Sequence, residues 1–172
     1  MIKVLLVTTG ENNVRKYLED NKCIHLQVMD VNDFADVEKH VFLMELEEAI
    51  KSGEAELMIT WRCPYVLPQS LFGIPKYGAY NIHPSLLPKY RGLDPWVGIF
   101  RNKEVENGVT LHRIANVVDG GEILYQQSYP ITPDDNVDTA RNNADVIAAN
   151  SVASTVRNLC STVCFGIASG GT

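Results

Sequence analysis

Cysteine and positive charge are both in short supply in this sequence. Its 15 lysine and arginine residues stand against 21 aspartate and glutamate residues, and the formal net charge at pH 7 is -6. That balance argues against a broad nucleic-acid-binding surface, and we expect no nucleic-acid partner. The four cysteines lack the spacing of zinc ligands. We therefore expect reduced thiols and no zinc site built from cysteine.

Long apolar runs and targeting signals are missing as well. No apolar run approaches the roughly 20 residues of a membrane-spanning helix. Met1 leads directly into a short apolar segment, without the ordered regions of a signal peptide. The glycine-rich fingerprint of dinucleotide-binding proteins is also absent. We expect a cytoplasmic protein without a membrane partner, whose 45% hydrophobic and 21% charged residues are ordinary for a globular domain.

The sequence does contain a regular alternation of strand-like and helix-like segments. Periodicity predicts strands at 2–8, 24–29, 55–60, 77–83, 109–114 and 122–129, and helices at 13–20, 34–51, 94–102 and 136–163. This alternation is typical of an α/β fold with a Rossmann-like, mostly parallel twisted sheet flanked by helices. The later strands are expected to add an antiparallel edge. We expect one catalytic domain over residues 1–165 and a flexible tail over 166–172.

One predicted strand ends in the residues Asn-Ile-His-Pro. Because side chains alternate along a strand, Asn81 and His83 point to the same side, and Pro84 ends the strand. Asp119 precedes two glycines in a loop between apolar segments, where the backbone is free to bring its carboxylate to the histidine. Each residue taken singly is compatible with a structural role. Together, an amide, an imidazole and a carboxylate suit acyl transfer, which requires a stabilised oxyanion and a moved proton.

The residues around this trio carry a family resemblance. The sequences NIHPSLLPKYRG at 81–92, GVTLH at 108–112 and VDGGEIL at 118–124 resemble the catalytic domain of the folate-dependent formyltransferases. That family includes glycinamide ribonucleotide transformylase, methionyl-tRNA formyltransferase and the sugar N-formyltransferases. The resemblance implies the formyltransferase fold, 10-formyltetrahydrofolate as formyl donor, and a catalytic role for the three polar residues named above.

The resemblance also indicates which residues contact the folate. The folate pterin would be held, partly through backbone groups, by two loops that contain Tyr65, Val66, Leu67, Val117, Val118 and Gly120. The residues that we expect to contact the amine substrate are Thr9, Gly10, Ser85, Lys89 and Arg91.

Two departures from the family pattern bear on the amine acceptor. Glycinamide ribonucleotide transformylases hold the substrate phosphate with a glycine-rich and serine-asparagine-rich turn after the first strand, whereas Glu11 would repel it here. Methionyl-tRNA formyltransferases carry a further domain that helps to hold tRNA, and only about 50 residues follow Asp119 here. By elimination we expect the acceptor to be a small-molecule amine. A nucleotide-linked amino sugar is the first choice, and glycinamide ribonucleotide the second.

Several alternatives stay open at this point. A formyltetrahydrofolate hydrolase would use the same three polar residues, and a non-catalytic folate-binding module would keep only the pocket. His112 would complete a metal trio with His83 and Asp119, but alternation turns its side chain the same way as Thr110 and Ile114, and we expect no metal. The sequence leaves open whether the chain forms a homo-oligomer.

Overall fold

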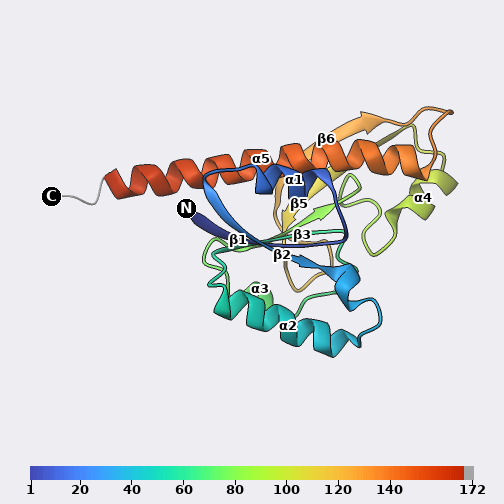
Figure 1. The fold of residues 1–172 in the computed structure, drawn as a ribbon. Helices are drawn as coiled ribbons and strands as arrows, with labels where there is room; N and C mark the ends of the chain where they lie inside the picture. The colour runs from blue at the N-terminus through green and yellow to red at the C-terminus, as the bar shows by residue number, and fades with distance from the viewer. Residues whose placement is uncertain (169–172) are drawn as a thin grey trace.

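The computed structural model describes the backbone of residues 1–168 and the side chains of residues 1–161. These residues form a six-stranded sheet in the order β2-β1-β3-β4-β5-β6 (Figure 1). Its strands are β1 (Ile2–Thr8), β2 (Ile24–Asp30), β3 (Leu57–Trp61), β4 (Ala79–His83), β5 (Glu106–Arg113) and β6 (Ile123–Pro130). Strands β1 to β4 run parallel, whereas β5 pairs antiparallel with β4 and β6 antiparallel with β5. The predicted mostly parallel sheet with an antiparallel edge is confirmed.

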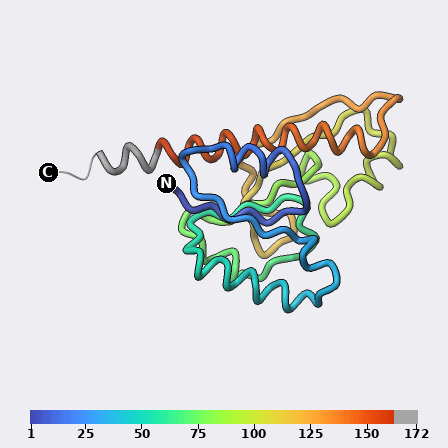
Figure 2. The backbone as a smooth tube through the Cα atoms, viewed as in Figure 1, coloured from blue at the N-terminus to red at the C-terminus, as the bar shows by residue number. Residues whose placement is uncertain are grey.

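Helices cover both faces of this sheet. They are α1 (Asn13–Glu19), α2 (Lys39–Ser52), α3 (Gln69–Phe72), α4 (Pro95–Arg101) and α5 (Val137–Ala168), with a 3-10 helix η1 (Val31–Phe34). Figure 1 shows α1 and α5 on one face and α2 and α3 on the other. Figure 2 shows α5 running beside the amino-terminal part of the chain, where it contacts α1. Among the described residues, no helix is long and apolar enough to cross a membrane.

Two predicted helix boundaries are wrong. The helix predicted from residue 34 begins only at Lys39, because Asp30 caps a separate 3-10 turn by accepting a hydrogen bond from the Asn32 amide. Phe34 nevertheless packs on Phe42 of α2, with ring centroids 5.4 Å apart, which explains why it fitted the helical pattern. Helix α5 extends to Ala168, beyond the predicted end at 163. The rest of the predicted tail, residues 169–172, lies outside the described residues.

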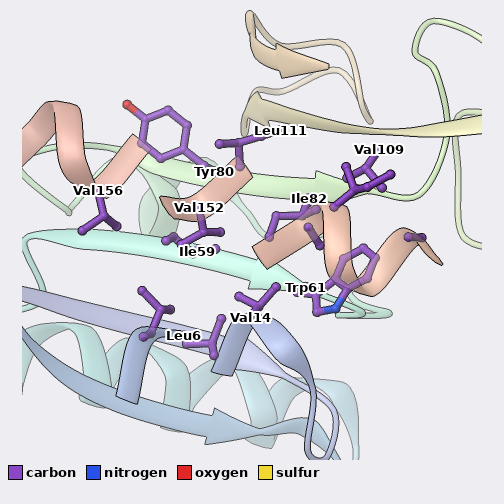
Figure 3. Packing of buried hydrophobic residues seen from close by; sticks show 14 of the residues in the cluster. Leu6, Val14, Ile59, Trp61, Tyr80, Ile82, Val109, Leu111, Val152 and Val156 are labelled. Atoms are coloured by element: carbon purple, nitrogen blue, oxygen red, sulfur yellow. The ribbon is translucent and has the colours of Figure 1, made fainter. Parts of the chain in front are cut away.

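The strands alternate between two apolar clusters, one on each face. Toward α1 and α5, the buried cluster includes Leu6, Ile59, Trp61, Tyr80, Ile82, Val152 and Val156, all labelled in Figure 3. Toward α2 and α3, the other cluster includes Leu5, Val7, Phe42, Leu46, Met58 and Ala79. Each fully buried side chain of this size stabilises the fold by roughly 1.5–3 kcal/mol. Burial on both faces fixes the register of the strands.

The strand order also determines where a ligand site can form. Strand β2 lies on one side of β1 and strand β3 on the other, so the connections diverge at the carboxyl ends of β1 and β3. In open α/β sheets, ligands bind outside the carboxyl ends of strands near such a divergence. The ends of β3 and β4 carry the polar residues described next.

Candidate active site

Three polar residues form a row across neighbouring strands. Thr60 of β3 is in register with Asn81 of β4, and Asn81 is in register with His112 of β5. The Thr60 hydroxyl donates to Oδ1 of Asn81 at 2.7 Å. That bond assigns the amide oxygen to the threonine side. The amide nitrogen therefore lies on the other side, 3.2 Å from Nε2 of His112 and 3.3 Å from Oδ1 of Asp119.

His112, which the sequence suggested only as a metal ligand and which was not predicted to be catalytic, is a member of the site. Its Nδ1 lies 2.9 Å from the carbonyl oxygen of Arg113. Because a carbonyl oxygen can only accept a hydrogen bond, Nδ1 of His112 carries the hydrogen. In the neutral ring, Nε2 is then free to accept from the Asn81 amide. A register irregularity separates His112 from Leu111 in the pairing with β6. Alternation within one strand could not show the antiparallel pairing that places His112 opposite Asn81.

His83 lies at the end of β4 and is 4% exposed. Its Nε2 donates to the carbonyl oxygen of Tyr90 at 2.7 Å, and its Nδ1 lies 3.5 Å from Oδ2 of Asp119. Burial lowers the pKa of His83 below its ordinary value, and the Asp119 charge and the Tyr90 bond only partly oppose this. His83 is therefore neutral at pH 7, with an unprotonated Nδ1 next to a carboxylate.

Asp119 connects the other polar groups of the site. It has a positive φ of 48°, in the left-handed region that aspartate tolerates better than most residues. The Gly92 amide donates to Oδ2 at 2.8 Å, and Nε2 of His112 lies 3.4 Å from Oδ1. Burial alone would raise the pKa of Asp119, but the neighbouring His112, the Gly92 amide and His83 lower it overall. The carboxylate is ionised at neutral pH.

These groups open into one cavity of about 740 Å³, a size typical of small-molecule sites. Asn81, His83, His112 and Asp119 all line it. Four of the residues predicted to contact folate line it as well, namely Tyr65, Val66, Leu67 and Val118. The other two, Val117 and Gly120, flank the lining residues Val118 and Asp119 in the sequence. Among the described residues, no group of three or more metal-ligating side chains could hold a metal ion.

A sequence model of the formyl transferase family matches residues 2–154. The chain belongs to this family. It is 38% identical over 112 residues to the methionyl-tRNA formyltransferases of Geotalea uraniireducens (strain Rf4) and Listeria monocytogenes serovar 1/2a. Each match covers 65% of this chain and 36% of the relative. The chain thus spans only about a third of the length of these curated relatives.

Solved structures show the same fold. Phosphoribosylglycinamide formyltransferase from Bacillus halodurans superimposes with a TM-score of 0.75 and 19% identity, over 94% of this chain and 96% of that one. A formyltetrahydrofolate deformylase from Pseudomonas syringae pv. tomato gives a TM-score of 0.72 and 18% identity, over 91% of this chain and 62% of that one. At these identities the likeness establishes the fold of this formyl transferase family member and no more.

The residues predicted to contact the amine lie elsewhere in this family member. Ser85 is fully buried, and its hydroxyl donates to the Lys89 carbonyl at 2.7 Å. The Lys89 ammonium lies 3.5 Å from a Glu104 carboxylate oxygen, and Arg91 is exposed. The Gly10 amide, next to Thr9, donates to the Asp30 carboxylate at 2.9 Å. Within the described part of the chain, the cavity lining includes none of the five predicted residues.

Other residues at the cavity were not among the predicted ligand contacts. Arg62, Trp96 and Arg141 line the cavity, and Asp145 of α5 contacts the lining residues Trp61 and Arg62. Asp145 accepts from Nε1 of Trp61 and from the Asn13 amide, both at 2.9 Å, and lies 3.4 Å from the guanidinium of Arg62. The spacing of Arg141 and Asp145, one helical turn apart, was visible in the sequence. Their position beside the end of β3 was not.

Proposed function

We propose that this chain transfers a formyl group from 10-formyltetrahydrofolate to a primary amine of a small molecule. The observation that carries the proposal is the arrangement of Asn81, His83 and Asp119 around one cavity. The amide nitrogen of Asn81 lies 3.3 Å and Nδ1 of the neutral His83 lies 3.5 Å from the ionised carboxylate of Asp119 there. These are the groups that amine attack on a formyl carbon requires. Membership of the formyl transferase family supports the same reaction.

The proposed reaction assigns a step to each group. The neutral amine attacks the formyl carbon, and Asn81 donates from Nδ2 to the developing oxyanion. His83 takes the amine proton at Nδ1, where the carboxylate of Asp119 stabilises the imidazolium and the imidazolium in turn stabilises the oxyanion. The proton then passes to N10 of the folate as the bond between N10 and the formyl carbon breaks. The products are the formylated amine and tetrahydrofolate.

The donor is proposed to bind along Tyr65, Val66, Leu67 and Val118. These side chains give the cavity an aromatic and apolar wall that suits a flat heteroaromatic ring. Val117 and Gly120 would contribute backbone groups from the adjoining loop. This wall lies next to Asp119, so a folate whose pterin is bound here would present the formyl group on N10 to the polar cluster.

A nucleotide-linked amino sugar is the acceptor class that we propose first. Asp30 already takes the amide of Gly10, and Asp145 takes that of Asn13, so the turn after β1 binds internal carboxylates. A substrate phosphate would have to displace them, which disfavours glycinamide ribonucleotide as acceptor. The cavity volume of about 740 Å³ leaves room for a sugar together with the donor.

Methionyl-tRNA is a second candidate acceptor. The 38% identity to methionyl-tRNA formyltransferases favours it. The net charge of -6 opposes it, because a polyanion is repelled by an acidic protein. Hydrolysis of the formyl-folate is a third candidate, in which water takes the place of the amine.

One assay compares these candidates directly. The purified chain is incubated with 10-formyltetrahydrofolate and, in turn, amino-sugar nucleotides, glycinamide ribonucleotide, methionyl-tRNA or no amine, and formylated product and free formate are quantified. We expect formylated amino sugar. Formate release without an amine would indicate the hydrolase, and formylation of another acceptor alone would replace the amino sugar. Absence of any turnover despite folate binding would refute the proposed transfer.

The role of His83 is tested in the same assay. His83→Ala is expected to lower turnover by roughly a hundredfold or more while folate binding persists, because proton transfer and charge stabilisation act in the transition state. His25→Ala is the matched control, since His25 is exposed on β2 outside the cavity lining. Equal loss of folding and binding in His83→Ala would show a structural role instead.

A further inference from the structure

The cavity has two chemically different ends, because it wraps around the carboxyl edge of the sheet. At one end, Cys63, Tyr65 and Leu67 belong to the apolar cluster under α2 and α3. At the other end, Trp61 and Trp96 belong to the cluster under α1 and α5, where Figure 3 shows Trp61. The first end suits the folate ring. The second end carries two guanidinium groups.

Arg62 is fixed in place at the second end. Its backbone has a φ of 60°, a left-handed conformation that costs a residue with a Cβ atom about 1–2 kcal/mol. Its guanidinium lies 3.4 Å from Oδ1 of Asp145. That carboxylate is itself held by Trp61 and Asn13 and is 7% exposed. The Asp145 carboxylate thus orients the Arg62 guanidinium, while the Arg62 side chain still lines the cavity.

Arg141 approaches the same end from helix α5. It lies four residues before Asp145, and residues at this spacing share one face of a helix. Its guanidinium carbon is 6.0 Å from the ring centroid of Trp96. Its nearest carboxylate, that of Asp138, is 87% exposed and 3.7 Å away, so this ion pair is weak. Arg141 therefore keeps hydrogen-bond donors available to a ligand.

We propose that Arg62 and Arg141 form a subsite for an anionic group, phosphate or carboxylate, of the amine acceptor. This inference rests on the proposed formyl transfer. Guanidinium groups bind phosphate and carboxylate in a bidentate manner, and two of them outweigh the single charge of Asp145. Asp94 also lines the cavity, but it is exposed to solvent, so its charge is screened and opposes the two guanidinium groups only weakly. The anion is bound here and not at Lys89 and Arg91, which lie outside the lining.

Tryptophan fluorescence gives a readout that does not depend on catalysis. The chain has two tryptophans, Trp61 and Trp96, and both line the cavity next to the two arginines. Titration with inorganic phosphate, and separately with acetate, at constant ionic strength is expected to change the fluorescence saturably. Tighter binding of phosphate would identify a phosphate-bearing acceptor, and tighter binding of acetate a carboxylate-bearing one.

Arg141→Gln should weaken the binding of the preferred anion at least tenfold, the worth of one charge-assisted contact. Arg157→Gln is the matched control, because Arg157 is exposed on the same helix about 24 Å away. It should bind like the unmodified chain. Equal affinity of Arg141→Gln and the unmodified chain, or no saturable change in either, would overturn the subsite.

Binding of a folate analogue shows whether the subsite serves the amine acceptor or the folate donor. Its dissociation constant should change less than twofold in Arg141→Gln. A tenfold loss would assign the subsite to the folate tail and overturn the proposal. The anion titration and the folate-analogue titration remain informative even if the chain does not transfer formyl groups, because neither titration requires turnover.

Discussion

At the scale of single residues, the orientation of one amide decides what the site can do. An asparagine offers a donor and an acceptor of nearly equal shape, and only its neighbours distinguish them. At Asn81, Thr60 donates to the oxygen at 2.7 Å, and Nε2 of His112 accepts from the nitrogen at 3.2 Å. The second N–H of Asn81 donates to Oδ1 of Asp119 at 3.3 Å, and the proposed mechanism requires this donor to shift from the carboxylate to the oxyanion as the amine attacks. Thr60 is a positioning residue in this arrangement, because it acts through Asn81.

Thr60→Val keeps the shape of the side chain and removes the hydroxyl. We expect turnover to fall about tenfold, the worth of one hydrogen bond, with little change in the Michaelis constants for donor and acceptor. Thr60→Ser restores the hydroxyl and should recover most of the rate. Steady-state kinetics of the three proteins provide the measurement. A serine variant as slow as the valine variant would show that the methyl group matters and the hydrogen bond does not.

The charge of His83 gives a prediction about pH. Burial lowers the pKa of His83, so the neutral ring is fully populated above the ordinary value of about 6.5 and is lost only as pH falls through a lower value. Asp119→Asn removes a charge that raises this pKa, and the midpoint should move lower still. An NMR titration of the imidazole nitrogens measures both midpoints. A midpoint above 7, or an upward shift in Asp119→Asn, would contradict this electrostatic account.

At the scale of elements, the strand that carries Asn81 and His83 could be predicted, and the elements that complete the site could not. Alternation and Pro84 were enough to place both side chains on one face of β4. The contribution of His112 depends on an antiparallel register between β4 and β5, which connects residues about 30 positions apart. The contribution of Asp145 depends on how α5 packs across the sheet. Neither the register between β4 and β5 nor the packing of α5 can be recognised from the residues next to each other in the sequence.

Asp145 shows how strongly α5 holds the ends of β1 and β3. Its buried carboxylate accepts from the Trp61 indole and the Asn13 amide. Asp145→Ala should lower the free energy of unfolding by roughly 2–4 kcal/mol, because it leaves these donors without their partner. Urea denaturation provides the measurement. Asp138→Ala, at an exposed position of the same helix, should stay within about 0.5 kcal/mol of the unmodified chain.

At the scale of the whole molecule, the fold class followed from strand and helix alternation, because each βα unit has to bury its apolar face against a shared sheet. The position of the cavity followed in part, from the rule that sites lie at the carboxyl ends of strands. Its two unlike ends did not follow. They arise because Trp61, the last residue of β3, packs on one face of the sheet, whereas Tyr65, in the loop after β3, packs on the other.

The cluster under α2 is thereby coupled to the cavity. Phe42 is fully buried, and its ring centroid lies 4.5 Å from that of Tyr65, a residue of the proposed folate wall. Phe42→Leu should lower the free energy of unfolding by roughly 1–2 kcal/mol, less than the 3–5 kcal/mol typical of Phe→Ala. It should also weaken binding of a folate analogue several-fold, because Tyr65 loses the ring that supports it.

Ile50→Val separates this effect from a general loss of stability. Ile50 is equally buried on α2, about 12 Å along the helix from Phe42, and shortening it should cost about 1 kcal/mol. Folate affinity should then change less than twofold, since the support of Tyr65 is intact. Denaturation and calorimetric titration of both variants make the comparison. If both lost folate affinity in proportion to stability, the wall would depend on the stability of the whole domain, and the contact between Phe42 and Tyr65 would have no special role.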